Sequence, residues 1–262
     1  MSKFLPESTY KVDSTMTYAK ISNLHETKST IVGKVKRINL ESQTFEVDLG
    51  GNISGYMSYS DSTIYPLYKD NGYLSTNVYT LIGRTILAKI LSVKGTHIKL
   101  SRKLNMIEAF ESLKSETEIS CATIVGYSRL CAFIDIGGGI LGKIYGKYFA
   151  PTMFENITDV GIPVYTNISV KVLECDTDNY RFSLSRVDTL PPVAETIRKN
   201  SCIFCKVFNE LGDGTGYYVL INHDICGILD SPDFNLKYGD EVFAYVKSLS
   251  SKGPRLSLVE VL

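Results

Sequence analysis

Two Cys/His pairs in the last third of the chain have residue types that bind zinc. They are "CIFC" at 202–205 and "HDIC" at 223–226, and the 17 residues between them approach the spacing of a zinc ribbon. However, "CIFCKVF" lacks the Gly of a metal knuckle and has the pattern of a strand, on which residues three apart face opposite ways. We therefore expect no bound metal. The alternative of a zinc site remains open, with ligands Cys202, Cys205, His223 and Cys226.

The sequence contains little that indicates catalysis. The three histidines, His25, His97 and His223, lie outside any nucleophile motif. Asp176 and Asp178 fall in a predicted turn, where solvated carboxylates are ordinary. The "GGG" at 137–139 is a predicted hairpin turn, and no helix N-terminus follows it to hold a phosphate. We predict no enzymatic activity and no cofactor.

The stretch "AFIDIGGGILGKIYGKYF", residues 132–149, indicates a different chemistry. It alternates apolar residues with others on both sides of its glycine turn. If its isoleucines point inward, then Phe133, Lys143 and Tyr145 point outward on one sheet face. An exposed ring beside a cation can stack a base while the cation holds a phosphate. This stretch is therefore a candidate nucleic-acid-binding face.

Composition sets the limits for such a face. The chain has 262 residues, 44% of them hydrophobic, and 28 Lys or Arg balance 28 Asp or Glu. Zero net charge argues against a strongly electrostatic nucleic-acid or membrane binder, although it allows local basic patches. The start has no apolar core of signal-peptide length, and no apolar run has membrane-spanning length. We expect a cytoplasmic protein whose six cysteines are mostly buried free thiols.

Three segments of the chain share one strand pattern. Each has two runs of alternating residues, a turn, a short third strand after a Gly, a variable loop and a final hairpin that ends on Leu-Ser. Five short strands per segment, repeated about every 85 residues, predict an all-β fold of three tandem five-stranded barrels joined by a short helix and linkers. The predicted boundaries are 29–103, 120–187 and 201–262 for the three repeats.

The remaining segments are predicted to connect or precede the barrels. Residues 104–119 contain "LNMIEAFESLKSETE", in which Met106, Phe110 and Leu113 form the apolar face of an amphipathic helix. Residues 188–200 contain a Pro-Pro pair near their start, at 191–192, and are predicted to form a linker. Residues 1–28 form an N-terminal extension, in which 14–28 is a candidate short helix capped by Ser14 or Thr15.

The ordered motifs resemble the RNA-binding repeat of the ribosomal protein S-one family. The family pattern runs G-A-F-V, then G-L-V-H, then V-K-V-L-x-x-D, then R-x-x-L-S, and here the second repeat has "CAFI", "GKIY", "VKVLECD" and "RFSLS". The resemblance covers most of residues 29–262. It implies five-stranded OB-fold barrels, binding of single-stranded RNA or mRNA, a role in translation and no catalysis.

Carried over residue by residue, the family's binding face is best preserved in the second repeat. Phe133 matches the Phe of G-A-F, and Tyr145 takes the position of the His. Asp176 matches the acid after V-L, and Arg181 matches the Arg before L-S. Leu130 departs from the aromatic residue that the family has there. We predict that these matched residues and Lys143 contact RNA.

The first repeat departs further from the family. Its alternation puts Phe45, Val47 and Leu49 inward, and Glu46 falls where the outward Phe would be. Residues 29–103 hold ten Lys or Arg against five Asp or Glu, an excess of five. We therefore expect phosphate contacts here. Ser58 replaces the His of the family pattern, and the predicted contact residues are Lys34, Lys36, Tyr56 and His97, the last in the Arg position.

The third repeat keeps only the outward aromatic residue, Tyr218. Asp230 falls at the His position, and the Arg position falls near Gly253. Residues 198–262 carry seven basic and eight acidic side chains, so we expect weak RNA binding or protein binding instead. The alternative function for the whole chain is a protein-docking scaffold whose degenerate barrels bind the ribosome or another RNA machine.

Overall fold

The computed structural model describes residues 5–65, 69–70, 73–74, 80–151, 156–231, 234–250 and 253–262. The chain forms two compact units. The first contains residues 1–124, 134–142 and 167–183, and the second contains 125–133, 143–166 and 184–262. The described helices and strands confirm the predicted all-β class with three five-stranded, barrel-like sheets. No helix within the described residues is long and apolar enough to cross a membrane.

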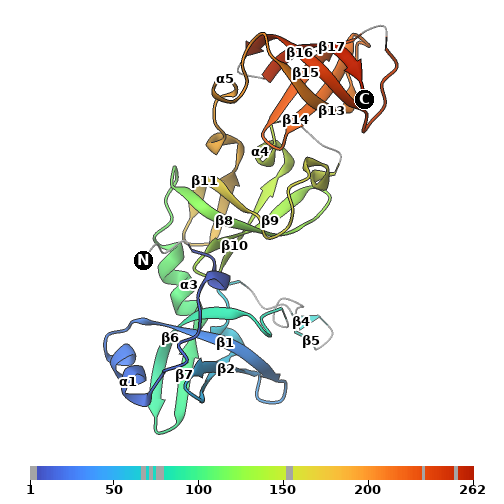
Figure 1. Cartoon of the computed structure of the whole chain (residues 1–262). Coiled ribbons are helices and arrows are strands. Elements are labelled where there is room, and N and C mark those ends of the chain that lie inside the picture. The colour runs from blue at the N-terminus through green and yellow to red at the C-terminus, as the bar shows by residue number, and fades with distance from the viewer. Residues whose placement is uncertain are drawn as a thin grey trace. The chain divides into compact units, whose positions relative to one another are not determined.

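The first sheet closes into a barrel (Figure 1) with the strand order β1-β2-β3-β7-β6. Its strands are β1 (Thr30–Asn39), β2 (Thr44–Gly50), β3 (Ile53–Ser58), β6 (Thr85–Lys94) and β7 (His97–Ser101). Phe45, Val47 and Leu49 are fully buried, which confirms the predicted inward register of β2. A two-residue pair, β4 (Lys69–Asp70) and β5 (Tyr73–Leu74), lies between β3 and β6 in sequence.

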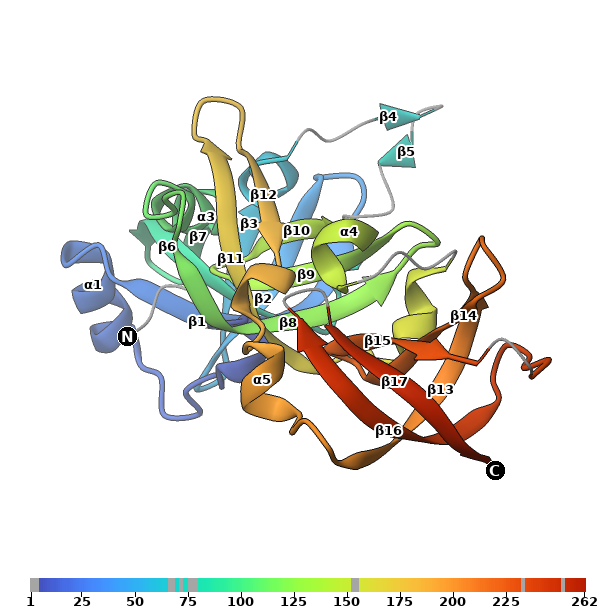
Figure 2. The same ribbon diagram turned by 90° about the horizontal axis from the view of Figure 1, so that it is seen from above.

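Two helices pack on β6 of this barrel, as Figures 1 and 2 show. Helix α1 (Tyr18–Glu26) is capped by Thr17, whose side chain accepts from the Lys20 amide, so the predicted Ser14 or Thr15 cap was wrong. Thr15 instead bonds to Asp13 in a turn before the helix. Helix α3 (Arg102–Phe110) starts earlier and ends earlier than the predicted 104–119 segment. The helix starts earlier because Ser101, at the end of β7, is its N-cap, and the Ser101 side chain accepts a hydrogen bond from the Leu104 amide.

The second sheet has the strand order β10-β9-β8-β11-β12. Its strands are β8 (Glu118–Tyr127), β9 (Cys131–Gly137), β10 (Ile140–Tyr145), β11 (Asn167–Asp176) and β12 (Arg181–Ser185). This is the order of the first barrel opened between its third and fifth strands. A barrel was predicted here too, and among the described residues no pairing between β10 and β12 closes this sheet. In the first barrel that closing seam is short and parallel, with only Tyr56–Lys99 and Met57–Leu100 paired.

The third sheet closes in the order β13-β14-β15-β17-β16. Its strands are β13 (Cys202–Glu210), β14 (Gly216–Asn222), β15 (Ile225–Asp230), β16 (Glu241–Ser250) and β17 (Gly253–Val261). The predicted linker before it contains the short helix α5 (Val193–Thr196), and α4 (Gly146–Phe149) follows β10. Single turns of 3-10 helix occur at Glu7–Thr9, Tyr59–Asp61, Ile157–Val160 and Val187–Thr189.

A buried arginine follows the Leu-Ser end of the first two repeats and makes equivalent contacts in each. Arg102 donates to the carbonyls of Ser62, at 3.0 Å, and Gly139, at 3.2 Å. In the second compact unit, Arg186 donates to the carbonyls of Phe149, at 3.0 Å, and His223, at 3.3 Å. Each arginine also pairs with a carboxylate: Glu7 for Arg102 and Asp224 for Arg186. These contacts tie the end of one repeat to the second hairpin turn of the next.

Candidate nucleic-acid interface

One row of side chains crosses the outer face of the first barrel. The strand register pairs Arg37 with Glu46, Glu46 with Tyr56 and Tyr56 with Lys99. Residues paired directly across neighbouring strands have side chains on the same face. The row therefore alternates cation, anion, aromatic ring and cation over strands β1, β2, β3 and β7.

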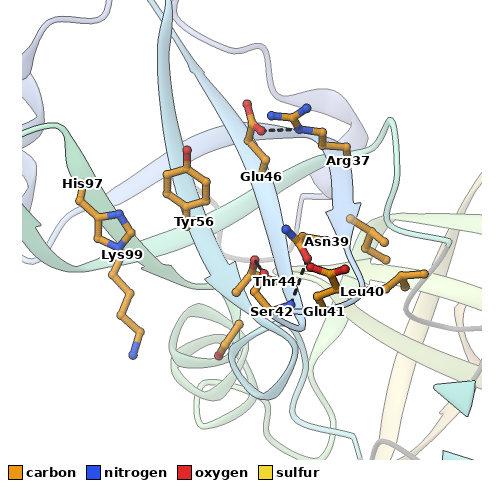
Figure 3. A pocket seen from close by; sticks show the side chains of 12 residues that line it. Arg37, Asn39, Leu40, Glu41, Ser42, Thr44, Glu46, Tyr56, His97 and Lys99 are labelled. Carbon is orange, nitrogen blue, oxygen red and sulfur yellow. Dashed lines mark hydrogen bonds and ion pairs between the residues drawn. The ribbon is translucent and has the colours of Figure 1, made fainter. Parts of the chain in front are cut away.

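Tyr56, a member of this row, forms a stacked pair with His97, the first residue of β7. Their ring centroids are 5.2 Å apart and the ring planes differ by 13°. Both side chains are exposed, and Figure 3 shows Tyr56 lying between His97 and Glu46. Sequence reasoning named Tyr56 and His97 separately as contact residues. The structure brings them together, because β3 and β7 pair in parallel at the barrel seam.

A groove with a volume of about 890 Å³ runs along this row. The loop between β1 and β2 forms one wall, and residues of the row form the other (Figure 3). Its lining residues are Arg37, Ile38, Asn39, Leu40, Glu41, Ser42, Thr44, Glu46, Tyr56, Ser58, His97 and Lys99. OB-folds bind extended oligomers over strands two and three, between the loops that join strands one to two and four to five. The groove occupies that region of this barrel.

Glu46 is held in place by two neighbours on the same face. Its Oε2 lies 2.6 Å from Arg37 Nε, and its Oε1 accepts from Ser54 Oγ at 3.1 Å. The hydrogen bond from Arg37 is the main reason that the pKa of Glu46 is lowered, so the side chain is a carboxylate at neutral pH. Sequence reasoning put Glu46 at an outward position but did not name it as a site residue. The signal that was available is an acid at the outward position where the family pattern has Phe.

The two lysines predicted as phosphate contacts lie on β1 of the same barrel. Lys34 and Lys36 are both exposed. Lys36 Nζ lies 3.3 Å from Asp48 Oδ2, so part of its charge is already matched within the protein.

In the second repeat, Lys143 lies over the ring of Phe133, with Nζ 5.6 Å from the ring centroid. Phe133 is half-buried, Lys143 is exposed and Tyr145 is 55% exposed. The isoleucines at 134, 136 and 144 are fully buried, which confirms the predicted alternation. Phe133, Lys143 and Tyr145 all belong to the second compact unit. Phe133 and Lys143 are therefore placed on one outward face.

Asp176 and Arg181 belong to the first compact unit, so the five predicted residues of the second repeat are divided between the two units. Asp176 ends β11 and organises the following turn: it accepts from the backbone amides of Asp178 and Asn179 and from the Asn179 side chain. These hydrogen bonds lower the pKa of Asp176. Arg181 begins β12 and is exposed. The geometry gives Asp176 a turn-forming role, and any RNA contact by either residue stays a prediction.

On the corresponding outer face of the third repeat, an acidic side chain is paired with two basic ones. Tyr218 is 37% exposed, and its ring centroid lies 5.8 Å from that of Phe208. Asp230 lies 2.9 Å from Arg255 and 3.4 Å from Lys247. Gly253 has no side chain, but the register aligns Arg255 with Ile228, as it aligns Lys99 with Tyr56 in the first barrel. The repeat thus keeps a cation there, and Asp230 is paired with it.

The four candidate zinc ligands are separated by strand geometry and burial. Cys202 is exposed and Cys205 is buried, as expected for residues three apart on a strand. Burial raises the pKa of Cys205 and of Cys226 to about 12, which opposes formation of the thiolates that bind metals. His223 Nδ1 lies 2.7 Å from the Val160 carbonyl oxygen. Among the described residues, no group of three or more His, Cys, Asp or Glu is placed to hold a metal ion.

Comparison with known proteins gives one relative in sequence. No family model matches the chain. The small ribosomal subunit protein bS1 of Staphylococcus saprophyticus is 31% identical over 166 residues, which are 62% of this chain and 40% of that protein. The chain thus spans about two-fifths of the length of this relative. This match confirms the similarity to the S-one family that the repeated motifs indicated.

Matches to solved structures are more distant. A multidomain protein with nucleic-acid-binding domains from Streptococcus pneumoniae has 12% identity and a TM-score of 0.28, over 89% of this chain and 74% of that one. The solution structure of GSP13 from Bacillus subtilis has 19% identity and a TM-score of 0.20, over 24% of this chain and 54% of that one.

Proposed function

We propose that this chain binds single-stranded RNA, without catalysis, on the outer faces of strands two and three of its first two repeats. The observation that carries the proposal is an outward ring beside a cation on the sheet face of both repeats. In the first repeat exposed Tyr56 on β3 lies beside Lys99 on β7, and in the second half-buried Phe133 on β9 lies beneath Lys143 on β10. Rings stack on unpaired bases and cations hold the backbone, so an extended single strand is the ligand that suits such a face.

The sequence relative extends the proposal to a process. That relative, bS1, is by name a protein of the small ribosomal subunit. We infer by similarity that this chain acts in translation, with mRNA and the ribosome as its partners and the cytoplasm as its location. The balanced charge of the chain, with 28 basic and 28 acidic side chains, favours modest affinity that depends on stacking more than on phosphate contacts.

Fluorescence anisotropy with a labelled single-stranded RNA tests this proposal on the full chain. Stacking is worth about 1–3 kcal/mol per base, so Phe133→Ala is expected to weaken binding by roughly five- to a hundredfold. Tyr18→Ala is the matched control, because Tyr18 is an exposed tyrosine on α1 rather than on a barrel strand. Unchanged affinity in a variant that combines Tyr56→Ala, Phe133→Ala and Tyr145→Ala would exclude these faces as the RNA site.

A second function, protein docking, is favoured by one surface of the third repeat. Phe204 is 64% exposed and its ring centroid lies 4.7 Å from that of Phe243, with Tyr245 also exposed on the same strand as Phe243. Exposed apolar groups that cluster in this way are typical of interaction surfaces. Binding of purified ribosomes that is lost in Phe204→Ser, while RNA affinity stays unchanged, would assign docking to this repeat.

A further inference from the structure

We infer that the first barrel selects guanine, with Tyr56 as the stacking platform and Glu46 as the residue that recognises the base edge. This inference rests on the proposed RNA binding and adds a base preference to it. It rests on the order of side chains across the face, the charge of the Glu46 carboxylate and the hydrogen-bonding pattern of the four bases.

The first step is that only one face of Tyr56 is available for stacking. His97 stacks on Tyr56 from the β7 side, with ring centroids 5.2 Å apart. Glu46 is paired with Tyr56 from the β2 side (Figure 3). Figure 3 shows Glu46 on the opposite side of Tyr56 from His97. We place a base on the ring face that His97 leaves open, which brings the base edge towards β2 and Glu46.

The second step is that Glu46 has acceptor capacity left. Its pKa is lowered, chiefly by the hydrogen bond from Arg37, so it is charged and accepts hydrogen bonds without donating any. Arg37 occupies one position on Oε2 and Ser54 one on Oε1. A carboxylate has about four acceptor positions, so each oxygen can accept one further hydrogen bond. The same two neighbours fix the orientation of the carboxylate before RNA binds.

The third step is that guanine presents two adjacent donors on its Watson–Crick edge, N1–H and the N2 amino group. Two carboxylate oxygens can accept from both at once. Adenine and cytosine each present an amino group next to an unprotonated ring nitrogen, which would face an oxygen of Glu46. Uracil presents one N–H between two carbonyl oxygens, and both carbonyls are repelled by the carboxylate. A charged acceptor therefore ranks guanine first and uracil last.

The test compares short uridine tracts that differ at a single central nucleotide: guanosine, inosine or uridine. Inosine keeps N1–H but lacks the N2 amino group. All measurements use the full chain carrying Phe133→Ala and Tyr145→Ala, which reduces binding by the second repeat. We expect guanosine to bind about tenfold more tightly than uridine, with inosine between them, since a bidentate contact discriminates between bases on this scale. Because this comparison changes only the RNA, it does not depend on how a variant folds.

Glu46→Gln should bring the three affinities to within about twofold of one another, because the amide replaces one acceptor oxygen with a donor. Asp48→Asn is the matched control: it removes the same charge from the same strand, at the ion pair with Lys36. It should change all three affinities equally and keep their ratios. Thermal melts of both variants check that the barrel remains folded.

The outcomes separate this inference from the proposal beneath it. Equal binding of guanosine, inosine and uridine, with all three weakened by Tyr56→Ala, would overturn guanine selection and leave RNA binding in place. A guanine preference that survives Glu46→Gln would assign the recognition to another residue and also overturn the inference. Binding that Tyr56→Ala leaves unchanged for all three tracts would remove RNA from this face altogether.

Discussion

Arg102 Nη2 lies 2.7 Å from Glu7 Oε2, and both side chains are 8% exposed although 95 residues separate them. Glu7 Oε1 also accepts from the Leu87 amide at 2.9 Å. The N-terminal extension is therefore fixed to the first barrel by an ion pair that solvent hardly reaches. A buried charge that loses its partner costs far more than an exposed one.

Glu7→Ala should accordingly destabilise the protein by about 3–5 kcal/mol, because it leaves Arg102 charged, buried and unpaired. The free energy of unfolding in urea measures this loss. Lys36→Ala serves as the control, since it breaks an ion pair whose side chains are 49% and 31% exposed. Such a pair is worth about 0–1 kcal/mol. Equal losses in the two variants would contradict a structural role for the buried pair.

Asp135 predicts a pH dependence of opposite sign to ordinary acid denaturation. Burial is the main reason that its pKa is raised from 3.8 to about 6 in the folded state. Between these values the folded state binds the proton more tightly than the unfolded state does. The free energy of unfolding that Asp135 contributes is therefore full below about pH 4 and is lost as the pH rises through about 6.

Asp135→Asn should remove this dependence and keep the hydrogen bond from the Gly137 amide, which Asp135 Oδ1 accepts at 2.8 Å. The variant should match the wild type near pH 4 and exceed its stability by about 1–3 kcal/mol at pH 7. Asp213→Asn is the opposite control, because hydrogen bonds from Thr215 lower the pKa of Asp213. Urea titrations at both pH values measure the difference. If the variant is no more stable than wild type at pH 7, ionisation of Asp135 does not destabilise the folded state, and the prediction is wrong.

Lys143→Ala should change the salt dependence of RNA binding more than its strength. If Lys143 neutralises one phosphate, its loss reduces the slope of log affinity against log salt by about 0.7 for a single strand. Lys114→Ala is the control, an exposed lysine between α3 and β8. Anisotropy titrations at several salt concentrations give the slope. A slope equal to that of the control would mean that Lys143 only supports the Phe133 ring.

Asp230→Asn should strengthen RNA binding by the third repeat. The substitution releases Lys247 and Arg255 from the carboxylate that they now contact, so both cations become available to phosphates. We expect RNA affinity to rise about two- to tenfold, with a steeper salt dependence. Glu241→Gln, which removes an exposed acid from β16, controls for net charge. An equal effect in both variants would indicate a general electrostatic gain rather than release of the two cations.

The sequence was sufficient for the fold class and for the core-facing side of the strands whose alternation it assigned. Phe45, Val47 and Leu49, like the isoleucines of β9, alternate with outward residues, and a period of two is a local property that the chain itself displays. The same alternation put Phe133, Lys143 and Tyr218 outward. The repeated motifs indicated the similarity to the S-one family, which the match to its relative confirmed.

Only the tertiary structure decided which side chains meet. His97 stacks on Tyr56 because the seam of the first barrel joins β7 to β3, and Arg37 holds Glu46 because a bulge in β1 follows Val35. Asp230 on β15 forms ion pairs with Lys247 and Arg255 because strand pairing brings β16 and β17 to it. Pairing between strands depends on register and on barrel closure, which are set by packing across the whole sheet and leave no local pattern in the sequence.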